Sequence, residues 1–230
     1  MPQQRRPADD LISAALPLVI VLDDDLSVRE SLISLFRSVG LRAVAFASVD
    51  DVAREKVMDQ ASCLVLDIRM PGMDGLAFQQ YLLSIGQKIP LIFMTGFGDV
   101  PMTVQAMKGG AIDFLPKPFE EAAMLEAVAA ALERDRKQRQ TERASAAIWL
   151  RFETLTPRER EVMRYVTSGH MNKQVAAALD LSEITIKVHR GRIMQKMAAR
   201  SLPDLVRMAE VVAGRLAPVA DSEAEPSYEP

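Results

Sequence analysis

Side chains suited to handling a metal ion and a phosphoryl group stand just after four short apolar stretches of this 230-residue chain. They are, in chain order, Asp23 and Asp24, Asp67, Thr95 and Lys117. Three carboxylates brought together repel one another unless a cation compensates, and oxygen ligands with retained water suit Mg²⁺. A hydroxyl and an ammonium would then bind the remaining phosphoryl oxygens. A solvated acidic rim with a capping threonine is the plainer alternative, but it does not explain why all four stretches end in a suitable group.

The apolar stretches predict the element that would bring these groups together. Runs of four to eight apolar residues bounded by turn signals are typical of strands buried on both faces of a parallel sheet. The expected strands are Leu18–Leu22, Leu41–Ala45, a run ending at Asp67, Pro90–Met94 and Ile112–Leu115. The expected helices between and after them are 27–39, 48–57, 75–86, 100–108 and one beginning near 120. This alternation predicts an α/β fold, a doubly wound parallel five-stranded sheet whose carboxyl strand ends share one edge.

The second half predicts an all-α, four-helix domain. Thr156-Pro157-Arg158-Glu159 has an N-cap, a proline at the first helical position and a capping-box glutamate. Asn172 is expected to cap a second helix, and Ser182 a third that runs to about Met197. A fourth helix follows Pro203. Two short helices joined by a three-residue turn, the second rich in basic residues, indicate a helix-turn-helix.

Charge and composition divide the chain in the same place. Residues 1–120 carry 11 basic and 15 acidic residues, a net charge of −4, whereas 151–217 carry 12 and 7, a net charge of +5. A basic domain is a candidate for nucleic-acid binding. The expected organisation is a flexible N-terminus (1–16), a first domain (17–131), a helical linker (132–152), the helix-turn-helix domain (153–216) and a disordered acidic tail (217–230).

Three further features predict a cytoplasmic protein that does not enter the membrane. No uninterrupted apolar run reaches membrane-spanning length, and the start of the chain lacks the pattern of a secretion signal. Cys63, the single cysteine, rules out a disulfide within the chain and suits a reducing compartment.

Residues 17–131 resemble the receiver domains of two-component response regulators, which have a flavodoxin-like fold. The resemblance rests on the ordered set of Asp23-Asp24, Leu66-Asp67 with Met70-Pro71-Gly72-Met73-Asp74-Gly75, Thr95-Gly96 and Lys117-Pro118. It implies that Asp67 accepts a phosphoryl group from a sensor histidine kinase. It also implies that Mg²⁺ is held by Asp24, Asp67 and the backbone carbonyl of Arg69, with Asp23 acting through water. The same resemblance implies that Thr95 and Lys117 bind the phosphoryl group. It also implies that Phe114 is the aromatic switch residue, although Phe114 is equally compatible with a purely structural core role.

Residues 153–213 resemble the DNA-binding domain of the LuxR/NarL family. The matching runs begin at Leu155, Asn172, Thr185 and Ser201, and with 99–103 they are most similar to the FixJ/TodT/StyR branch. The expected DNA-binding residues are Lys173, Thr185, Lys187, Val188, Arg190 and Arg192. Val188 is expected at a thymine methyl and Lys187 at a base edge, with the other basic residues at phosphates. Met171, where many relatives have Ser or Thr, and Gly191 inside the basic helix depart from the usual pattern.

The expected function is therefore a transcriptional regulator of a two-component system, switched by phosphorylation. It would form a homodimer when phosphorylated, bind double-stranded promoter DNA, act on RNA polymerase, and be no enzyme beyond its own Mg²⁺-dependent phosphorylation and dephosphorylation. Asp23-Asp24-Asp25 also fits a haloacid-dehalogenase-type phosphatase, with Asp23 as nucleophile and Asp25 as acid/base. Against this, Asp67 precedes Thr95, and no acidic pair follows Lys117 at a strand end. A receiver that acts through protein contact alone is the third possibility.

Overall fold

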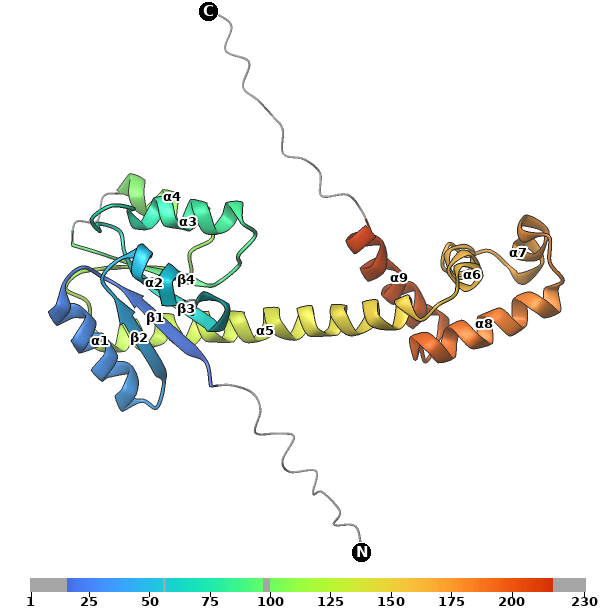
Figure 1. The fold of residues 1–230 in the computed structure, drawn as a ribbon, viewed down its shortest axis with the longest axis horizontal. Coiled ribbons are helices and arrows are strands. Elements are labelled where there is room, and N and C mark those ends of the chain that lie inside the picture. Colours follow the sequence, from blue (N-terminus) through green and yellow to red (C-terminus); the bar gives the residue numbers. More distant parts are fainter. Residues whose placement is uncertain (1–15, 56, 97–99, 217–230) are drawn as a thin grey trace, which may run out of the picture. The chain divides into compact units, whose positions relative to one another are not determined.

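The computed structural model describes residues 16–216 except 56 and 97–99, and it divides into two compact units after Arg139 (Figure 1). The expectations for the N-terminal 15 residues and for the tail 217–230 lie outside the described residues. Each unit is described by itself below.

The first unit is built on a parallel five-stranded sheet in the order β2-β1-β3-β4-β5. The strands are β1 (Leu18–Leu22), β2 (Arg42–Phe46), β3 (Ala61–Asp67), β4 (Leu91–Thr95) and β5 (Asp113–Pro116). All four pairings are parallel, as predicted. β1 matches its predicted range, whereas β2, β4 and β5 begin and end one residue later than expected. The four strands whose ends carry the candidate groups are neighbours in the sheet, so those ends meet at one edge.

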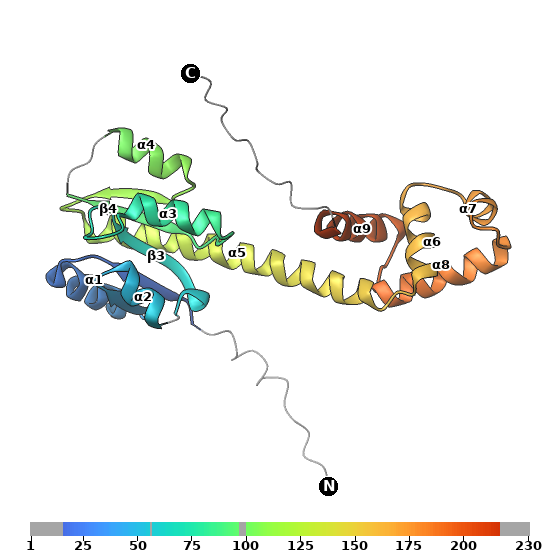
Figure 2. The same cartoon turned by 45° about the horizontal axis from the view of Figure 1, so that its top comes forward.

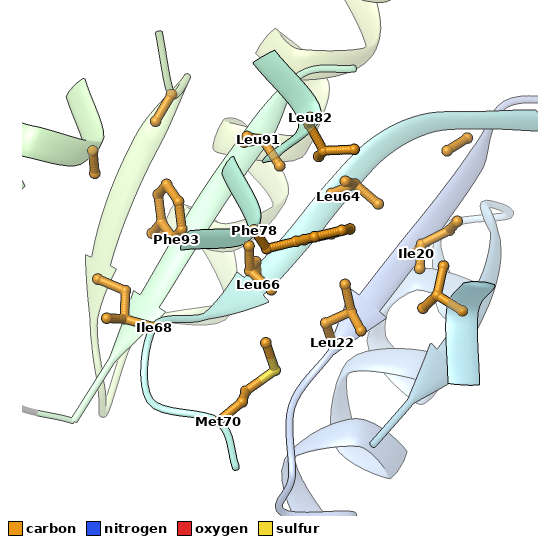
Figure 3. Packing of buried hydrophobic residues seen from close by; sticks show 14 of the residues in the cluster. Ile20, Leu22, Leu64, Leu66, Ile68, Met70, Phe78, Leu82, Leu91 and Phe93 are labelled. Carbon is orange, nitrogen blue, oxygen red and sulfur yellow. The ribbon is translucent and has the colours of Figure 1, made fainter. Parts of the chain in front are cut away.

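Helices cover both faces of this sheet. Successive strand residues point to opposite faces, and in β1 and β3 all of them are buried, so each face must be covered. Val19 and Val21 face α1 (Leu26–Ser38) and the start of α5 (Glu121–Glu153). Ile20 and Leu22 face the layer of α2 (Val49–Glu55), α3 (Gly75–Ser84) and α4 (Val100–Lys108). A 3₁₀ turn, η2 (Met58–Gln60), precedes β3. Figure 3 shows Phe78 and Leu82 of α3 over the sheet residues, and α4 lies beside α3 in both views (Figures 1 and 2).

The long helix α5 remains attached to the sheet beyond its apolar stripe. The heptad pattern ends after Leu132 because Asp135 and Arg139 take the next positions. These two side chains pair with each other at 2.8 Å, and Arg139 Nη2 donates to the backbone oxygen of Ala61 at 2.6 Å. A polar anchor thus continues the packing of α5 to Arg139, while the helix itself continues unbroken to Glu153.

The second unit contains the predicted helix-turn-helix. Its helices are α6 (Pro157–Thr167), α7 (Asn172–Leu179), α8 (Glu183–Met197) and α9 (Leu202–Leu216). Three residues join α7 to α8, and the left-handed conformation of Asp180 (φ 52°) makes the turn. Residues of all four helices and of the end of α5 form one apolar core, which includes Val162, Val175, Ile186 and Val212. Among the described residues, no helix is long and apolar enough to cross a membrane.

Candidate phosphoryl site and nucleic-acid interface

Three carboxylates converge at the carboxyl edge of the sheet, as the sequence predicts. Asp23 and Asp24 follow β1, Asp67 ends β3, and one carboxylate oxygen from each lies within 4.8 Å of the others. Asp23 is fully buried and Asp67 nearly so, whereas Asp24 is exposed. A set of oxygen ligands that is open on one side suits a hard divalent cation that keeps some of its water. The residues present therefore fit Mg²⁺.

Lys117 offsets part of the negative charge of this cluster. Its Nζ donates to Asp23 Oδ2 at 2.5 Å and to Asp67 Oδ2 at 2.6 Å, so one ammonium bridges two carboxylates. Burial alone would lower the pKa of Lys117, but the bonds to Asp23 and Asp67 outweigh burial and raise the pKa. The ammonium is therefore charged at neutral pH. Burial raises the pKa of Asp23, against the opposing effect of Lys117.

The end of β3 is held rigidly around Asp67. The backbone N–H of Arg69 donates to Asp67 Oδ1 at 3.0 Å, and the N–H of Gly75 donates to the Ile68 oxygen at 2.9 Å. A Cβ on Gly75 would lie 2.6 Å from the backbone oxygen of Asp67. Only glycine therefore lets α3 begin this close to the strand end. The predicted involvement of the Arg69 carbonyl in metal binding stays a prediction.

Arg29 is a residue of this site that the sequence reasoning missed. Its Nη1 donates to the backbone oxygens of both Asp23 (2.7 Å) and Asp24 (2.9 Å), which fixes the acidic loop against α1. The sequence does contain a signal for this contact, because Arg29 lies one turn into the helix that follows the acidic pair. Such a residue lies close enough to reach back to the loop carbonyls.

Asp25 has a capping role that speaks against the phosphatase alternative. Its Oδ1 accepts from the Ser27 N–H at 2.7 Å, and its own N–H donates to Asp23 Oδ1 at 2.9 Å. The carboxylate is the N-cap of α1, which is not the placement expected of an acid/base group beside Asp23.

Thr95 and Phe114 lie where the sequence places them. Thr95 ends β4 and is fully buried, and its backbone oxygen accepts from the Lys117 N–H at 2.7 Å. Phe114 lies half-buried in β5 and packs, like Met102 of α4, against the apolar core under α3. Their switch roles stay predictions.

In the second unit, α8 presents a basic and apolar outer face. Ile186, Ile193 and Met197 are buried, whereas Val188 on the opposite side, and Lys187 and Arg192 on either side of Val188, are exposed. Lys173 is exposed on α7. Ile184, in the first turn of α8, is 78% exposed. Three of the predicted DNA-binding residues thus share one exposed helix face.

Arg190 and Thr185 are engaged within the protein. Arg190 Nη1 donates to Asn172 Oδ1 at 2.7 Å, which ties α8 to α7. The Thr185 hydroxyl lies 2.8 Å from the hydroxyl of Ser182, the N-cap of α8. Both predicted contacts with DNA stay predictions, but Arg190 also has a structural task.

The expectation that Asn172 caps α7 is wrong. Asn172 is the first residue of the helix, and Met171 occupies the N-cap. Gln174 Oε1 accepts from the Met171 N–H at 2.8 Å, which satisfies the backbone of the N-cap residue from the third helical position. The amide oxygen of Asn172 is therefore available to Arg190.

A receiver-type phosphoryl site joined to a helix-turn-helix defines a class of protein, and comparisons with known proteins agree. The family described as response regulator receiver domain matches residues 19–129, and the luxR family of bacterial regulatory proteins matches 153–209. The chain belongs to the response regulators that join a receiver to a LuxR-type DNA-binding domain, and it is a transcriptional regulator controlled by phosphorylation.

Its relatives lie in the FixJ-like branch of that family. The chain is 55% identical to nodulation protein W of Bradyrhizobium diazoefficiens over 195 residues, which cover 85% of this chain and 86% of the relative. It is 44% identical to the response regulator TodT of Pseudomonas putida, with 84% and 85% covered. Among solved structures, the response regulator StyR matches with a TM-score of 0.76 and 46% identity, covering 85% of this chain and 99% of that one.

Proposed function

We propose that Asp67 is the phosphoacceptor and that Asp23, Asp24, Asp67 and the carbonyl of Arg69 hold the Mg²⁺ ion that the transfer requires. The observation that supports this is the convergence of three carboxylates and Lys117 at one strand edge. When bound, the ion offsets the negative charge that the phosphoryl group brings to the carboxylates.

The chemistry assigned to the chain's own residues is a single displacement. A carboxylate oxygen of Asp67 forms a bond to phosphorus as the bond from phosphorus to the donor's histidine nitrogen breaks, and the histidine leaves as neutral imidazole once it is protonated. Lys117 moves its ammonium onto a phosphoryl oxygen, and the Thr95 hydroxyl donates to another. Hydrolysis of the acyl phosphate later restores the carboxylate and ends the signal.

We further propose that phosphorylation couples to DNA binding through a homodimer. Val104 and Met107, one turn apart on α4, are each 45% exposed, which leaves an apolar strip on a helix that packs against β5. A two-fold pair formed through this strip would place two copies of α8 at adjacent half-sites of promoter DNA. In this proposal a sensor histidine kinase supplies the phosphoryl group, and the DNA-bound dimer acts on RNA polymerase. The protein works in the cytoplasm.

The phosphoacceptor is tested by mass. The full chain, incubated with acetyl phosphate and Mg²⁺, is expected to gain one phosphoryl mass on the proteolytic peptide that contains Asp67. Asp67→Asn and chelator should each abolish the gain, and Asp59→Asn, an exposed acidic residue in η2, should leave it unchanged. Labelling that persists in Asp67→Asn would contradict the assignment.

A further inference from the structure

The outward face of α8 has an apolar centre. Successive helix residues are turned by about 100°, so Ile184, Val188, Gly191 and Gln195 all point away from the side that carries Ile186 and Ile193. All four are exposed. The positive charges of Lys187 and Arg192 flank this centre and do not occupy it.

Ile184 is the extreme member of this face. At 78% exposure it is the most exposed large hydrophobic side chain among the described residues, and it stands in the first turn of α8. Nothing in the core requires it, because Ile186 fills the buried position of the same turn. Val188 lies one turn further along the same face and is 47% exposed.

We propose that Ile184 is a specificity-determining residue, which reads a thymine by contact with its 5-methyl group. The inference rests on the proposed entry of α8 into the major groove. There the thymine methyl is the one apolar group that base edges present, and cytosine offers a polar amino group at the same edge. An isoleucine at the centre of the face buries apolar surface against the thymine methyl and gains no such contact with cytosine, which carries only a hydrogen at that carbon.

The bare backbone of Gly191 supports this reading. A Cβ built on Gly191 meets no atom within 4 Å, so it faces open space where a DNA edge would lie. The absence of a side chain two turns beyond Ile184 lets the helix lie closer to the base edges, which brings a short apolar side chain into contact. The flanking Lys187 and Arg192 remain long enough to reach base edges or phosphates.

The test replaces single thymines by deoxyuridine, which removes only the methyl group. Duplexes bound by the phosphorylated full chain are selected from a random pool, and each thymine of the selected site is replaced in turn. One buried methyl is worth about 0.8 kcal/mol, so a contacted thymine should cost the wild-type chain about four-fold in affinity, measured by fluorescence anisotropy.

Ile184→Ala should bind the parent duplex more weakly and lose its sensitivity to deoxyuridine at one thymine only. Val188→Ala should lose sensitivity at a different thymine. Leu150→Ala, which truncates an exposed leucine on α5, should keep the wild-type pattern. If Ile184→Ala keeps every wild-type loss while Val188→Ala erases one, the role of Ile184 is wrong although α8 enters the groove. If neither variant alters the pattern, the placement of α8 in the groove fails as well.

Discussion

Replacing Lys117 by methionine removes the charge that bridges two carboxylates while keeping a side chain of similar length. Asp23 and Asp67 would then remain close together with little solvent to separate them, since their side chains are 0% and 10% exposed. Breaking a buried pair by removing one partner costs about 3–5 kcal/mol. Because the Lys117 side chain is itself 20% exposed, we expect a loss near the lower end, about 3 kcal/mol, in the unfolding free energy of the receiver without metal.

Cys63 makes this loss measurable in the receiver alone. It is the single cysteine of the chain, lies in β3 and is fully buried, so a thiol reagent labels it only when the receiver opens. When reclosing is fast, the labelling rate follows the population of the open form. A loss of about 3 kcal/mol should therefore accelerate labelling of Lys117→Met roughly 150-fold in chelator.

Saturating Mg²⁺ should slow labelling of Lys117→Met much more than labelling of the wild type. The cation binds only the folded site, and in the variant it meets no competing ammonium. The raised pKa of Lys117 keeps its ammonium charged at neutral pH, and on the alkaline side the bridge is lost as the pH rises through that pKa. Lys108→Met, on the exposed side of α4, serves as the control and should label at the wild-type rate. Wild-type labelling of Lys117→Met in chelator would refute this account of the acidic cluster.

Three further substitutions separate structural from functional roles. Arg29→Gln should cost about 1–3 kcal/mol, since the buried Asp23 carbonyl loses its donor, and should weaken Mg²⁺ binding in calorimetric titration. Gly191→Ala should stabilise the DNA-binding domain by about 1 kcal/mol in denaturant titrations followed by Trp149 fluorescence, yet weaken DNA binding. Glu159→Gln should cost about 1.5–3 kcal/mol at neutral pH, because it loses its charged bond to Lys196, and should flatten the acid side of the stability profile.

The pH direction for Glu159 follows from its pKa. Burial raises this pKa, but the bonds from Lys196 and Thr156 outweigh burial and lower it below the ordinary 4.5. Stability from Glu159 is therefore present above pH 4.5 and is lost as the pH falls through the lower folded pKa. An unchanged acid limb in Glu159→Gln would contradict this. Unchanged Mg²⁺ affinity in Arg29→Gln would leave Arg29 with a structural role only. Unchanged or tighter DNA binding by Gly191→Ala would show that the bare backbone at this position does not favour DNA binding.

The strands and their ends were predictable because burial on both faces and turn residues are local signals. The sequence alone predicts the strand Leu18–Leu22 and the polar groups that follow each strand. Because the carboxyl ends of parallel strands share one edge of the sheet, it also predicts that Asp23, Asp67 and Lys117 lie together. Thr156 and Glu159 likewise form the predicted capping box. In each case the physical cause lies within a few residues of the feature.

What escaped prediction depends on partners far apart in the sequence. The packing of α5 as far as Arg139 depends on a bond to Ala61, 78 positions away. Asparagine is a common N-cap residue, but Gln174 stabilises an N-cap at Met171, one residue before Asn172. The side chain of Asn172 instead accepts a hydrogen bond from Arg190. The sequence does not show which apolar side of α8 faces the core, because the helix carries apolar residues on both sides. The exposure of Ile184 therefore became clear only from the packed structure.

The most direct test of the whole account measures affinity for a selected duplex before and after phosphorylation. The full chain with Mg²⁺ should bind more tightly after acetyl phosphate is added than after acetate, and Asp67→Asn should bind alike under both conditions. A gain that Asp67→Asn shares, or one that survives chelation of Mg²⁺, would contradict the claim that a phosphoryl group on Asp67 controls DNA binding.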